Sequence, residues 1–469
     1  IFLLSNILIT TQSRRKSMVK MFGMGSNNQS DLYIIGGGLA GCEAAWTAAQ
    51  RGVHVILFEM RPQKMTEAHV TGNLAELVCS NSLGSNLIDR TSGLLKEELR
   101  FLGSLLIDIA EKTKLPAGNA LAVDREAFSI AIENVVLSHP NIQVIRDEEK
   151  YIPDDLPVII ASGPLTSESL CKDIVRLTGE ENLYFYDAIA PVVYADSIDF
   201  KIAFRASRYD FDNSEEGDYI NCPFSKEEYD RFVDLLTHAE RIELKDFEKD
   251  ILSGQQKFFE GCLPIEILAA RGKDALAFGP LRPTGLKDPH TGHRPWAVLQ
   301  LRQDNLAGDL YNLVGFQTNL RYSEQERVFR NIPGLENAVF ARFGQMHRNT
   351  FLSSPGLINE HLQLISDPRI FFAGQLSGVE GYMGNIGTGL AAGLNAAAFI
   401  HGDPLPLFPI ETMLGSMIHY LANSEKKNFQ PIKANFGILP PLENPPRSKQ
   451  ERGRQYAIRS LDTLKKLRS

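Results

Sequence analysis

Two cysteines stand in sequence contexts that suit chemistry. Cys79 lies where a short apolar stretch runs into polar residues, within 76–82. We expect a loop or a helix start there, whose backbone N–H groups would favour a thiolate. Cys262 is bracketed by Gly261 and Pro264, so we expect a tight turn to hold it. Each could also be a buried structural cysteine, which is the more common role of an isolated cysteine.

The other three cysteines, Cys42, Cys171 and Cys222, have plainer surroundings, and Cys42 is most simply part of a core. The five cysteines show no CxxC pair and no metal-ligand spacing. The sequence therefore predicts no metal site and disfavours a disulfide oxidoreductase. An odd number of cysteines without a paired framework is typical of a reducing compartment, so we expect a cytoplasmic protein.

A glycine-rich segment at 36–41 has the spacing of a dinucleotide-binding motif. It follows the apolar run 31–35 and precedes an alanine-rich stretch, and a second apolar run, 54–58, ends at Glu59. This order predicts strand, turn, helix and strand, with the phosphates of a dinucleotide at the N-terminus of the helix. The alternative is a glycine turn with a structural role alone.

Each conspicuous position of this motif has a separate physical task. Gly36 would make the turn, Gly38 would let the backbone approach a pyrophosphate, and Gly41 would let the helix pack closely on the strand. An acidic side chain at the end of the second strand would accept hydrogen bonds from ribose hydroxyls. The predicted cofactor contacts here are Gly36, Gly37, Gly38, Leu39, Ala40, Gly41 and Glu59.

Two later segments favour FAD over NAD as the dinucleotide. The apolar runs 157–163 and 369–374 end in Gly163 and Gly374, and the second leads into a Gly/Ala-rich stretch, 387–397. A strand that ends in glycine before a helix can approach the flavin ring or the ribityl chain closely. Gly163 and Gly374 are therefore predicted cofactor contacts too.

These elements predict an α/β protein with a discontinuous Rossmann-like FAD-binding domain and an α+β insertion domain. Residues 31–189 and 341–446 would form the FAD-binding domain, and 190–340 the insertion that carries the substrate surface. Residues 1–30 would be an extension outside the fold, which we expect to be disordered. Residues 447–469 would be a basic C-terminal tail.

Composition and charge exclude several classes of protein. Of 469 residues, 43% are hydrophobic and 23% charged, which excludes collagen-like, disordered and disulfide-scaffold chains. The apolar stretch 1–10 is too short to cross a membrane. The net charge of −8 opposes a globally basic nucleic-acid binder, but the tail is basic. That tail is either a solvated helix or a surface that faces RNA.

Several long segments resemble the folate- and FAD-dependent tRNA (uracil-5-)-methyltransferases, and the likeness extends from about residue 32 to about residue 442. The segments that carry it are 36–41 (GGGLAG), 59–62 (EMRP), 76–82 (ELVCSNS), 116–118 (PAG), 121–125 (LAVDR), 259–264 (FEGCLP), 346–351 (MHRNTF) and 378–382 (GVEGY).

The resemblance implies transfer of a one-carbon unit from 5,10-methylenetetrahydrofolate to C5 of a uridine in the T-loop of tRNA. Reduced FAD would be carrier and reductant, and NADH or NADPH would reduce it. Cys262 would add to C6 of the uridine, because C5 becomes nucleophilic once a thiolate has added to C6. Cys79 would lie near the flavin, either as base for the C5 proton or to protect a methylene-carrying flavin.

Two alternatives stay open. The same chemistry could act on a uridine of ribosomal RNA, since both cysteines would be needed there too. The chain could also be a flavoprotein without catalysis, because residues 383–387 (MGNIG) replace the Glu-Ser-Ala-Ala that we expect after Tyr382. This replacement would place smaller, more flexible residues beside the flavin.

Overall fold

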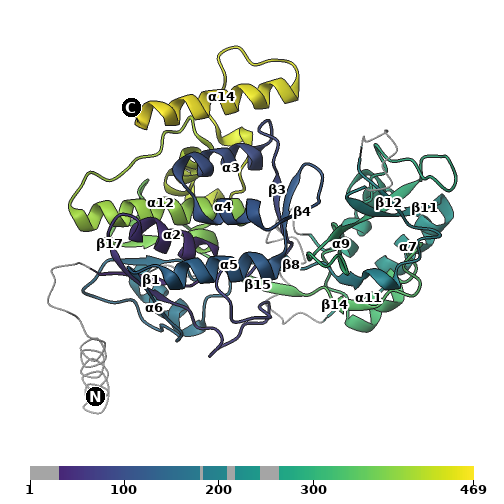
Figure 1. Ribbon diagram of the computed structural model, residues 1–469, viewed down its shortest axis with the longest axis horizontal. Helices are drawn as coiled ribbons and strands as arrows, with labels where there is room; N and C mark the ends of the chain where they lie inside the picture. Colours follow the sequence, from purple (N-terminus) through teal and green to yellow (C-terminus); the bar gives the residue numbers. More distant parts are fainter. Residues whose placement is uncertain (1–30, 180–182, 209–216, 243–262, 469) are drawn as a thin grey trace.

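The computed structural model describes residues 31–179, 183–208, 217–242 and 263–468. A six-stranded sheet with the order β16-β17-β7-β1-β2-β6 forms the centre of the larger domain (Figure 1). Its strands are β1 (Asp31–Ile35), β2 (His54–Phe58), β6 (Ile142–Ile145), β7 (Val158–Ile160), β16 (Gln363–Leu364) and β17 (Asp367–Phe372). The predicted extension at 1–30 lies outside the described residues.

This sheet is parallel apart from the short antiparallel pairing of β16 with β17. The run of apolar residues in β1 is almost entirely buried, as expected for a strand that is covered on both faces. Strand β7 pairs with β1 on one side and with β17 on the other, with Val158 opposite Tyr33 and Ile370. The C-terminal part of the chain thus rejoins the first domain, and the predicted α/β class is confirmed.

Helices α2 (Leu39–Ala49) and α12 (Tyr382–His401) pack against each other in this domain. A Cβ atom on Gly389 would lie 2.3 Å from the carbonyl oxygen of Ala40, so a side chain at Gly389 would push the two helices apart. The Gly/Ala-rich stretch therefore allows a close helix contact, and its helix begins before the predicted residue 387. This contact places the N-termini of both helices at the carboxyl ends of β1 and β17.

Two buried carboxylates fasten further helices to this core. Glu43 on α2 accepts hydrogen bonds from Ser104 Oγ (2.9 Å) and from the backbone N–H groups that begin α4. Glu98 on α3 accepts from the first N–H groups of α13 and from Ser460 Oγ of α14 (2.5 Å). These helices are α3 (Thr91–Leu102), α4 (Leu105–Lys112), α5 (Arg125–Ser138), α6 (Glu168–Thr178), α13 (Met413–Asn423) and α14 (Lys449–Arg468).

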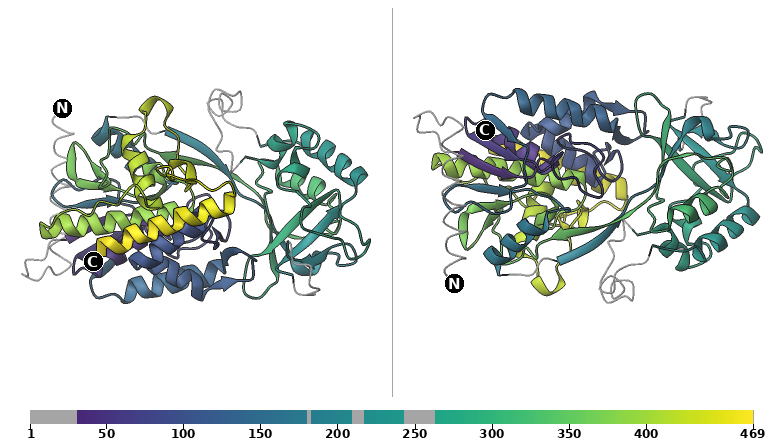
Figure 2. Two further views of the ribbon diagram at one scale, coloured as in Figure 1. Left: turned by 90° about the horizontal axis from the view of Figure 1, so that it is seen from above. Right: turned by 90° about the horizontal axis from the view of Figure 1, so that it is seen from below.

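The insertion forms a second lobe around an antiparallel sheet with the order β10-β11-β12-β13-β9-β14 (Figure 2). Its strands are β9 (Val192–Tyr194), β10 (Phe204–Ala206), β11 (Tyr219–Phe224), β12 (Ala297–Gln303), β13 (Leu310–Leu313) and β14 (Phe340–Arg342). Its helices are α7 (Lys226–Thr237), α9 (Ile265–Ala270), α10 (Ala275–Phe278) and α11 (Tyr322–Phe329). A separate hydrophobic core, with Phe232 and Phe316 at its centre, holds the lobe together.

Two small sheets lie between the lobes. Strands β8 (Leu183–Ala188) and β15 (Met346–Phe351) pair in the antiparallel sense and carry the chain into and out of the insertion. Strands β3 (Ser82–Ser85), β4 (Lys114–Leu115) and β5 (Ala120–Val123) form a three-stranded sheet that begins just after Cys79. The cysteine segment therefore lies at the junction of the two lobes.

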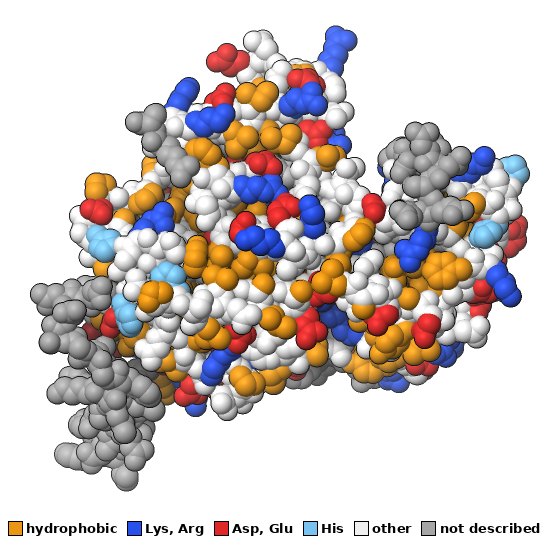
Figure 3. All heavy atoms as spheres, in the orientation of Figure 1, with side chains coloured by type: hydrophobic (Ala, Val, Ile, Leu, Met, Phe, Trp, Pro, Cys, Tyr) orange, Lys and Arg blue, Asp and Glu red, His pale blue; other side chains and the backbone are white. Residues whose placement is uncertain are grey.

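The basic tail is helical, and α14 packs on α3, where Ser460 Oγ bonds to Glu98. Tyr456, Ala457 and Leu464 of α14 are buried. Lys449, Arg454, Lys465 and Lys466 are exposed, with acidic side chains among them (Figure 3), whereas Arg459 donates to the carbonyls of Pro440 and Pro441. In the part of the chain that the structure describes, no helix is both long enough and apolar enough to cross a membrane.

Candidate functional site

A pocket opens where the glycine turn meets the carboxyl ends of β1, β2, β7 and β17. It holds about 970 Å³ of space, part of which is open to solvent. Seven predicted cofactor contacts line it, whereas the predicted contacts Gly37 and Gly41 do not. The lining residues from the predicted set are Gly36, Gly38, Leu39, Ala40, Glu59, Gly163 and Gly374. Their contact with FAD stays a prediction.

The glycine turn presents bare backbone to the pocket. Gly36 has φ +109°, in the region that favours glycine, and a Cβ there would lie 2.5 Å from the carbonyl oxygen of Ala161. At Gly38, by contrast, a Cβ would meet no atom of the described residues within 4 Å. That open side lies at the N-terminus of α2, where free N–H groups favour a phosphate.

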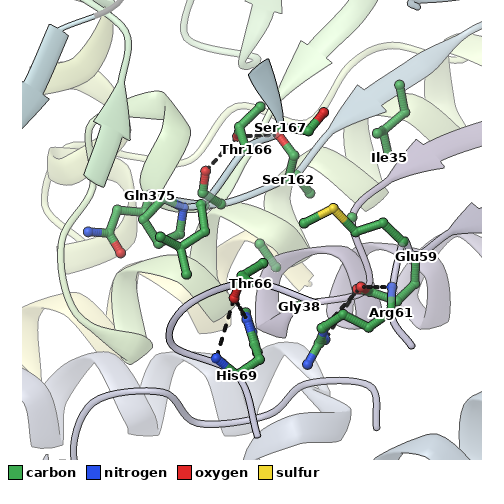
Figure 4. Close-up of a pocket in the computed structure, with 18 of the residues that line it drawn as sticks. Ile35, Gly38, Glu59, Arg61, Thr66, His69, Ser162, Thr166, Ser167 and Gln375 are labelled. Atoms are coloured by element: carbon green, nitrogen blue, oxygen red, sulfur yellow. Dashed lines mark hydrogen bonds and ion pairs between the residues drawn. The ribbon is translucent and has the colours of Figure 1, made fainter. Parts of the chain in front are cut away.

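Glu59 ties the turn to the end of β2, because its Oε2 accepts from the backbone N–H of Gly37 (3.0 Å). Oε2 also accepts from Arg61 Nη2 (3.2 Å), and Oε1 accepts from Arg61 N and Nε, both at 2.9 Å (Figure 4). Burial raises the pKa of Glu59, but the bonds from Arg61 and Gly37 outweigh it and hold the pKa below its ordinary value. The four acceptor positions are thus in use, and a ribose hydroxyl would have to share one of them.

The opposite wall comes from segments far along the chain. Gly163 and Gly374 both have positive φ, +72° and +73°, at the ends of β7 and β17. Thr166 Oγ1 bonds to the carbonyl of Gly163 (2.7 Å) and to Ser162 Oγ (2.8 Å), which fixes this edge of the pocket (Figure 4). In the first turn of α12, Asn385 Oδ1 is buried and has no hydrogen-bond partner among the described residues.

These residues fit a flavin dinucleotide. The open face at Gly38 and the N-terminus of α2 suit a pyrophosphate, which needs close backbone and free N–H donors. At the α12 end, the orphan oxygen of Asn385 suits a ligand that carries an N–H donor, because a buried acceptor without a partner is costly. A dinucleotide whose nitrogen-rich ring lies at the α12 end would give partners both to the N–H groups of α2 and to Asn385 Oδ1.

Cys79 lies beside this pocket, half-buried, and both of its backbone groups are held. Its N–H donates to the hydroxyl of Tyr382 (2.9 Å), and its carbonyl accepts from Arg125 Nη2 (2.7 Å). Tyr382 and Val78, the residue before Cys79, both line the pocket. The Cys79 backbone is therefore fixed at the pocket's edge by residues of two other segments.

Cys262 lies outside the described residues. Leu263, which follows it, is buried, and α9 begins at Ile265. Cys42 and Cys222 are buried, and burial raises the pKa of both thiols well above its ordinary value, so both are inert packing residues. Within the described ranges, no group of three or more His, Cys, Asp or Glu side chains could hold a metal ion.

The segment 383–387 is a helix, so the expectation of more flexible residues beside the cofactor is wrong. It forms the first turns of α12. A Cβ on Gly384 would lie 2.9 Å from Met417 Cε, and one on Gly387 would lie 3.0 Å from Leu414 Cδ1. Both glycines therefore pack on α13, whereas Asn385 lines the pocket. The small residues allow close helix packing.

Sequence reasoning from the glycine motif missed Asn385, Thr166 and the lining role of Tyr382. The start of α12 could have indicated Asn385 and Tyr382, because polar residues in the first helical turn after a strand that ends in glycine lie next to the ligand. The role of Arg125 was harder to predict from the sequence, because its partners are distant along the chain. They are Asp304 and the carbonyls of Leu77 and Cys79.

Comparison with known proteins places this geometry in a family. The model of the family described as "Glucose inhibited division protein A" matches residues 31–404. Among curated proteins, "Methylenetetrahydrofolate--tRNA-(uracil-5-)-methyltransferase TrmFO" of Heliobacterium modesticaldum is 53% identical, over 93% of this chain and 97% of that relative. The chain belongs to the TrmFO family.

Other members of the TrmFO family match equally well. The protein of the same description from Bacillus subtilis is 52% identical over 93% of this chain and 98% of its own length. Among solved structures, GidA of Aquifex aeolicus superposes with a TM-score of 0.62 at 16% identity, and the match covers 94% of this chain and 76% of that one. At this identity the likeness concerns the fold alone.

Proposed function

We propose that this protein transfers a one-carbon unit from 5,10-methylenetetrahydrofolate to C5 of a uridine in the T-loop of tRNA. Reduced FAD is its carrier and reductant, and NADH or NADPH supplies the electrons. The observation that carries the proposal is the position of Cys79. Its N–H bonds to Tyr382, which lines a pocket that fits a flavin dinucleotide, in a chain that belongs to the TrmFO family.

Cys262 is the proposed nucleophile. Uracil C5 is a poor nucleophile, and a thiolate that adds to C6 converts the ring into an enolate that reacts at C5. After the carbon unit is attached, loss of the C5 proton would release that unit from its carrier as an exocyclic methylene on C5. A hydride from the reduced cofactor would convert the methylene to methyl while the Cys262 thiolate leaves C6, so that the ring double bond returns. Cys262 comes just before α9, so the insertion lobe supplies this group.

Cys79 is the proposed base for the C5 proton. A base must be held at a fixed place beside the reacting carbon, because proton transfer needs hydrogen-bond distance. The bonds from Cys79 to Tyr382 and Arg125 hold its backbone on both sides. The alternative role of Cys79, protection of the one-carbon unit on the cofactor, needs the same position.

The residues that would hold FAD are the glycine turn, Glu59, Gly163, Gly374 and Asn385. When bound, FAD supplies the electrons and the atom that carries the one-carbon unit. The chain's own part is to bind the pyrophosphate at the α2 N-terminus, to accept a hydrogen bond at Asn385 Oδ1, and to exclude water around the reacting atoms.

The decisive experiment is nucleoside mass spectrometry. The purified protein is incubated with 5,10-methylenetetrahydrofolate, FAD and NADPH, beside unmodified tRNA or unmodified ribosomal RNA. We expect 5-methyluridine in tRNA, at a T-loop uridine. 5-Methyluridine in ribosomal RNA alone would move the function to that RNA, and a yellow protein inactive on both would favour a flavoprotein without catalysis.

The Cys262→Ala variant tests the nucleophile. We expect methylation to fall at least about a thousandfold, or ~4 kcal/mol of transition-state stabilisation, with unchanged flavin absorbance. Cys222→Ala is the matched control, because Cys222 is a buried packing residue of the same lobe. Normal methylation by Cys262→Ala would show that Cys262 is not the nucleophile.

A further inference from the structure

Three arginines and one aspartate gather beside Cys79 at the junction of the two lobes. We call Arg125, Arg302, Arg342 and Asp304 the junction cluster. Arg125 begins α5, whereas Arg302 lies on β12 and Arg342 ends β14. All three guanidinium groups interact electrostatically with Asp304 and with Cys79. The cluster thus carries three positive side chains against one carboxylate.

Arg125 is fully engaged by the protein. Its Nε donates to both oxygens of Asp304 (3.2 and 3.0 Å), and its two Nη atoms donate to the carbonyls of Leu77 and Cys79, each at 2.7 Å. Asp304 is therefore used by Arg125. Arg302 donates through Nε to Asn81 Oδ1 (2.8 Å), a neutral partner, so its charge is not offset by that bond.

Arg342 differs from both. Its Nε and Nη2 are buried and have no hydrogen-bond partner among the described residues. These two atoms lie on the same edge of the guanidinium, where their parallel N–H bonds match the two oxygens of a carboxylate or a phosphate. Burial, followed by the neighbouring Arg125, lowers the pKa of Arg342 to about 10, so the group is still a cation at neutral pH.

Buried charge without a partner is unfavourable, and so is a buried donor without an acceptor. Asp304 is the acidic side chain that acts on Arg342 in the described part of the cluster, and Arg125 already binds it. An anionic group of a bound ligand would pair with the buried charge of Arg342 and accept hydrogen bonds from its buried donors.

We propose that Arg342 binds an oxyanion of a cosubstrate through the Nε–Nη2 edge, beside Cys79. The proposal rests on the proposed function, which supplies two sources of this chemistry. One is a phosphate of the tRNA backbone next to the target uridine, and the other is a carboxylate of the folate's glutamate. Arg302 adds to the positive field, and Arg125 holds the Cys79 segment against this site.

The test compares Arg342→Met with Arg342→Lys in the FAD-loaded protein. Methionine keeps the apolar stem and removes charge and donors, and lysine keeps the charge but loses the two-pronged edge. Arg327→Met on α11 is the control, because its guanidinium is exposed and pairs with Glu324. Dissociation constants are measured for an unmodified tRNA transcript, for tetrahydrofolate and for tetrahydropteroate, which lacks the glutamate.

We expect Arg342→Met to raise the dissociation constant of one cosubstrate at least about tenfold, with Arg342→Lys in between. If the source is tRNA, the slope of log Kd against log salt also falls by about 0.7 to 0.9. If the source is folate, the binding of tetrahydrofolate weakens and the binding of tetrahydropteroate does not.

Unchanged binding of both cosubstrates to Arg342→Met, or loss of FAD in their place, overturns the oxyanion site. Failure of the wild-type protein to bind tRNA and tetrahydrofolate at all would instead refute the proposed function. The two failures are therefore distinguishable. Because the lysine variant keeps the buried charge, it reports on the site even if the methionine variant folds poorly.

Discussion

The dinucleotide pocket and the junction cluster are built in different ways. The pocket presents backbone: bare glycine at Gly38, positive φ at Gly163 and Gly374, and helix N-termini. The junction cluster presents long side chains: Arg125 on α5 bonds to the Cys79 carbonyl and to Asp304 after β12, and Arg302 on β12 bonds to Asn81. Binding of a common cofactor thus depends on local chain geometry, whereas placement of Cys79 depends on contacts between lobes.

This difference predicts separable defects. A change in the pocket should remove the cofactor and with it every activity. A change in the junction cluster should leave the cofactor bound and affect the chemistry at Cys79. Gly38→Val and Arg125→Met test that separation directly, and changes at Glu43 and in the tail, which lie outside both regions, should have smaller effects.

Gly38→Val should abolish cofactor binding. The branched side chain would project into the open side of the glycine turn and block a pyrophosphate. We expect bound FAD, measured by absorbance per protein, to fall at least about tenfold, because even one charge-assisted bond to phosphate is worth that much. Gly272→Val is the control, since Gly272 also has open space around it but lies in the insertion lobe. Full flavin content in Gly38→Val would contradict the phosphate role.

Arg125→Met should loosen the Cys79 segment at the edge of the pocket. It removes the bonds to Asp304, Leu77 and Cys79, and loss of one partner of a buried pair costs about 3 kcal/mol. We expect kcat to fall about tenfold to a hundredfold while FAD content stays near that of the wild type. Arg125→Lys should recover little, because lysine cannot reach these acceptors together.

The control for Arg125 is Arg176→Met, whose guanidinium is 67% exposed and pairs with Asp173. Alkylation of Cys79 by iodoacetamide, followed by mass spectrometry, gives a second readout that global destabilisation alone would not change in native buffer. Parallel loss of FAD and methylation in Arg125→Met would show that the cluster supports the pocket itself.

Glu43→Gln should change how stability depends on pH. Burial raises the pKa of Glu43 to about 7 from 4.5 in spite of three hydrogen bonds. The stability that this group contributes is present below pH 4.5 and is lost as pH rises through about 7, by about 3 kcal/mol. Unfolding in urea from pH 5 to 8 should therefore show a smaller fall for Glu43→Gln than for the wild type.

Glu227→Gln on α7 is the control, because Glu227 is exposed. Burial also raises the pKa of Glu98 to about 7, so Glu98 should act in the same direction. The double variant Glu43→Gln/Glu98→Gln should therefore flatten the dependence of stability on pH further. An unaltered profile in Glu43→Gln would mean that this carboxylate titrates as it does in the unfolded chain.

Neutralising the tail should have the smallest effect. Lys465 and Lys466 are exposed on α14, and Lys465 pairs with Asp462. We expect the double change to Gln to shift the dissociation constant of tRNA less than about twofold, because such pairs contribute little. A fall of the salt slope by about 1.5 would instead support an RNA-facing tail. The Arg342→Met variant, measured in the same salt titration of tRNA binding, is the comparison for the tail variant.

Much of the pocket could be predicted from neighbouring residues. The motif at 36–41 and the runs that end in Gly163 and Gly374 are local patterns, and the strands and turns formed where they were expected. The orphan oxygen of Asn385 could not be predicted, because its environment depends on how α12 packs on α2 and α13. The packing role of Gly384 and Gly387 was missed for the same reason.

The sequence by itself determined the class of fold and the glycine turn, because short-range sterics and apolar patterning act within a few residues of each. The roles of the two cysteines stay predictions. The tertiary structure decided what surrounds Cys79. Arg125 and Asp304 are far apart in the chain, and so are Cys79 and Tyr382. Partners of buried charges are chosen by the packing of whole lobes, and residue spacing along the chain carries no record of that choice.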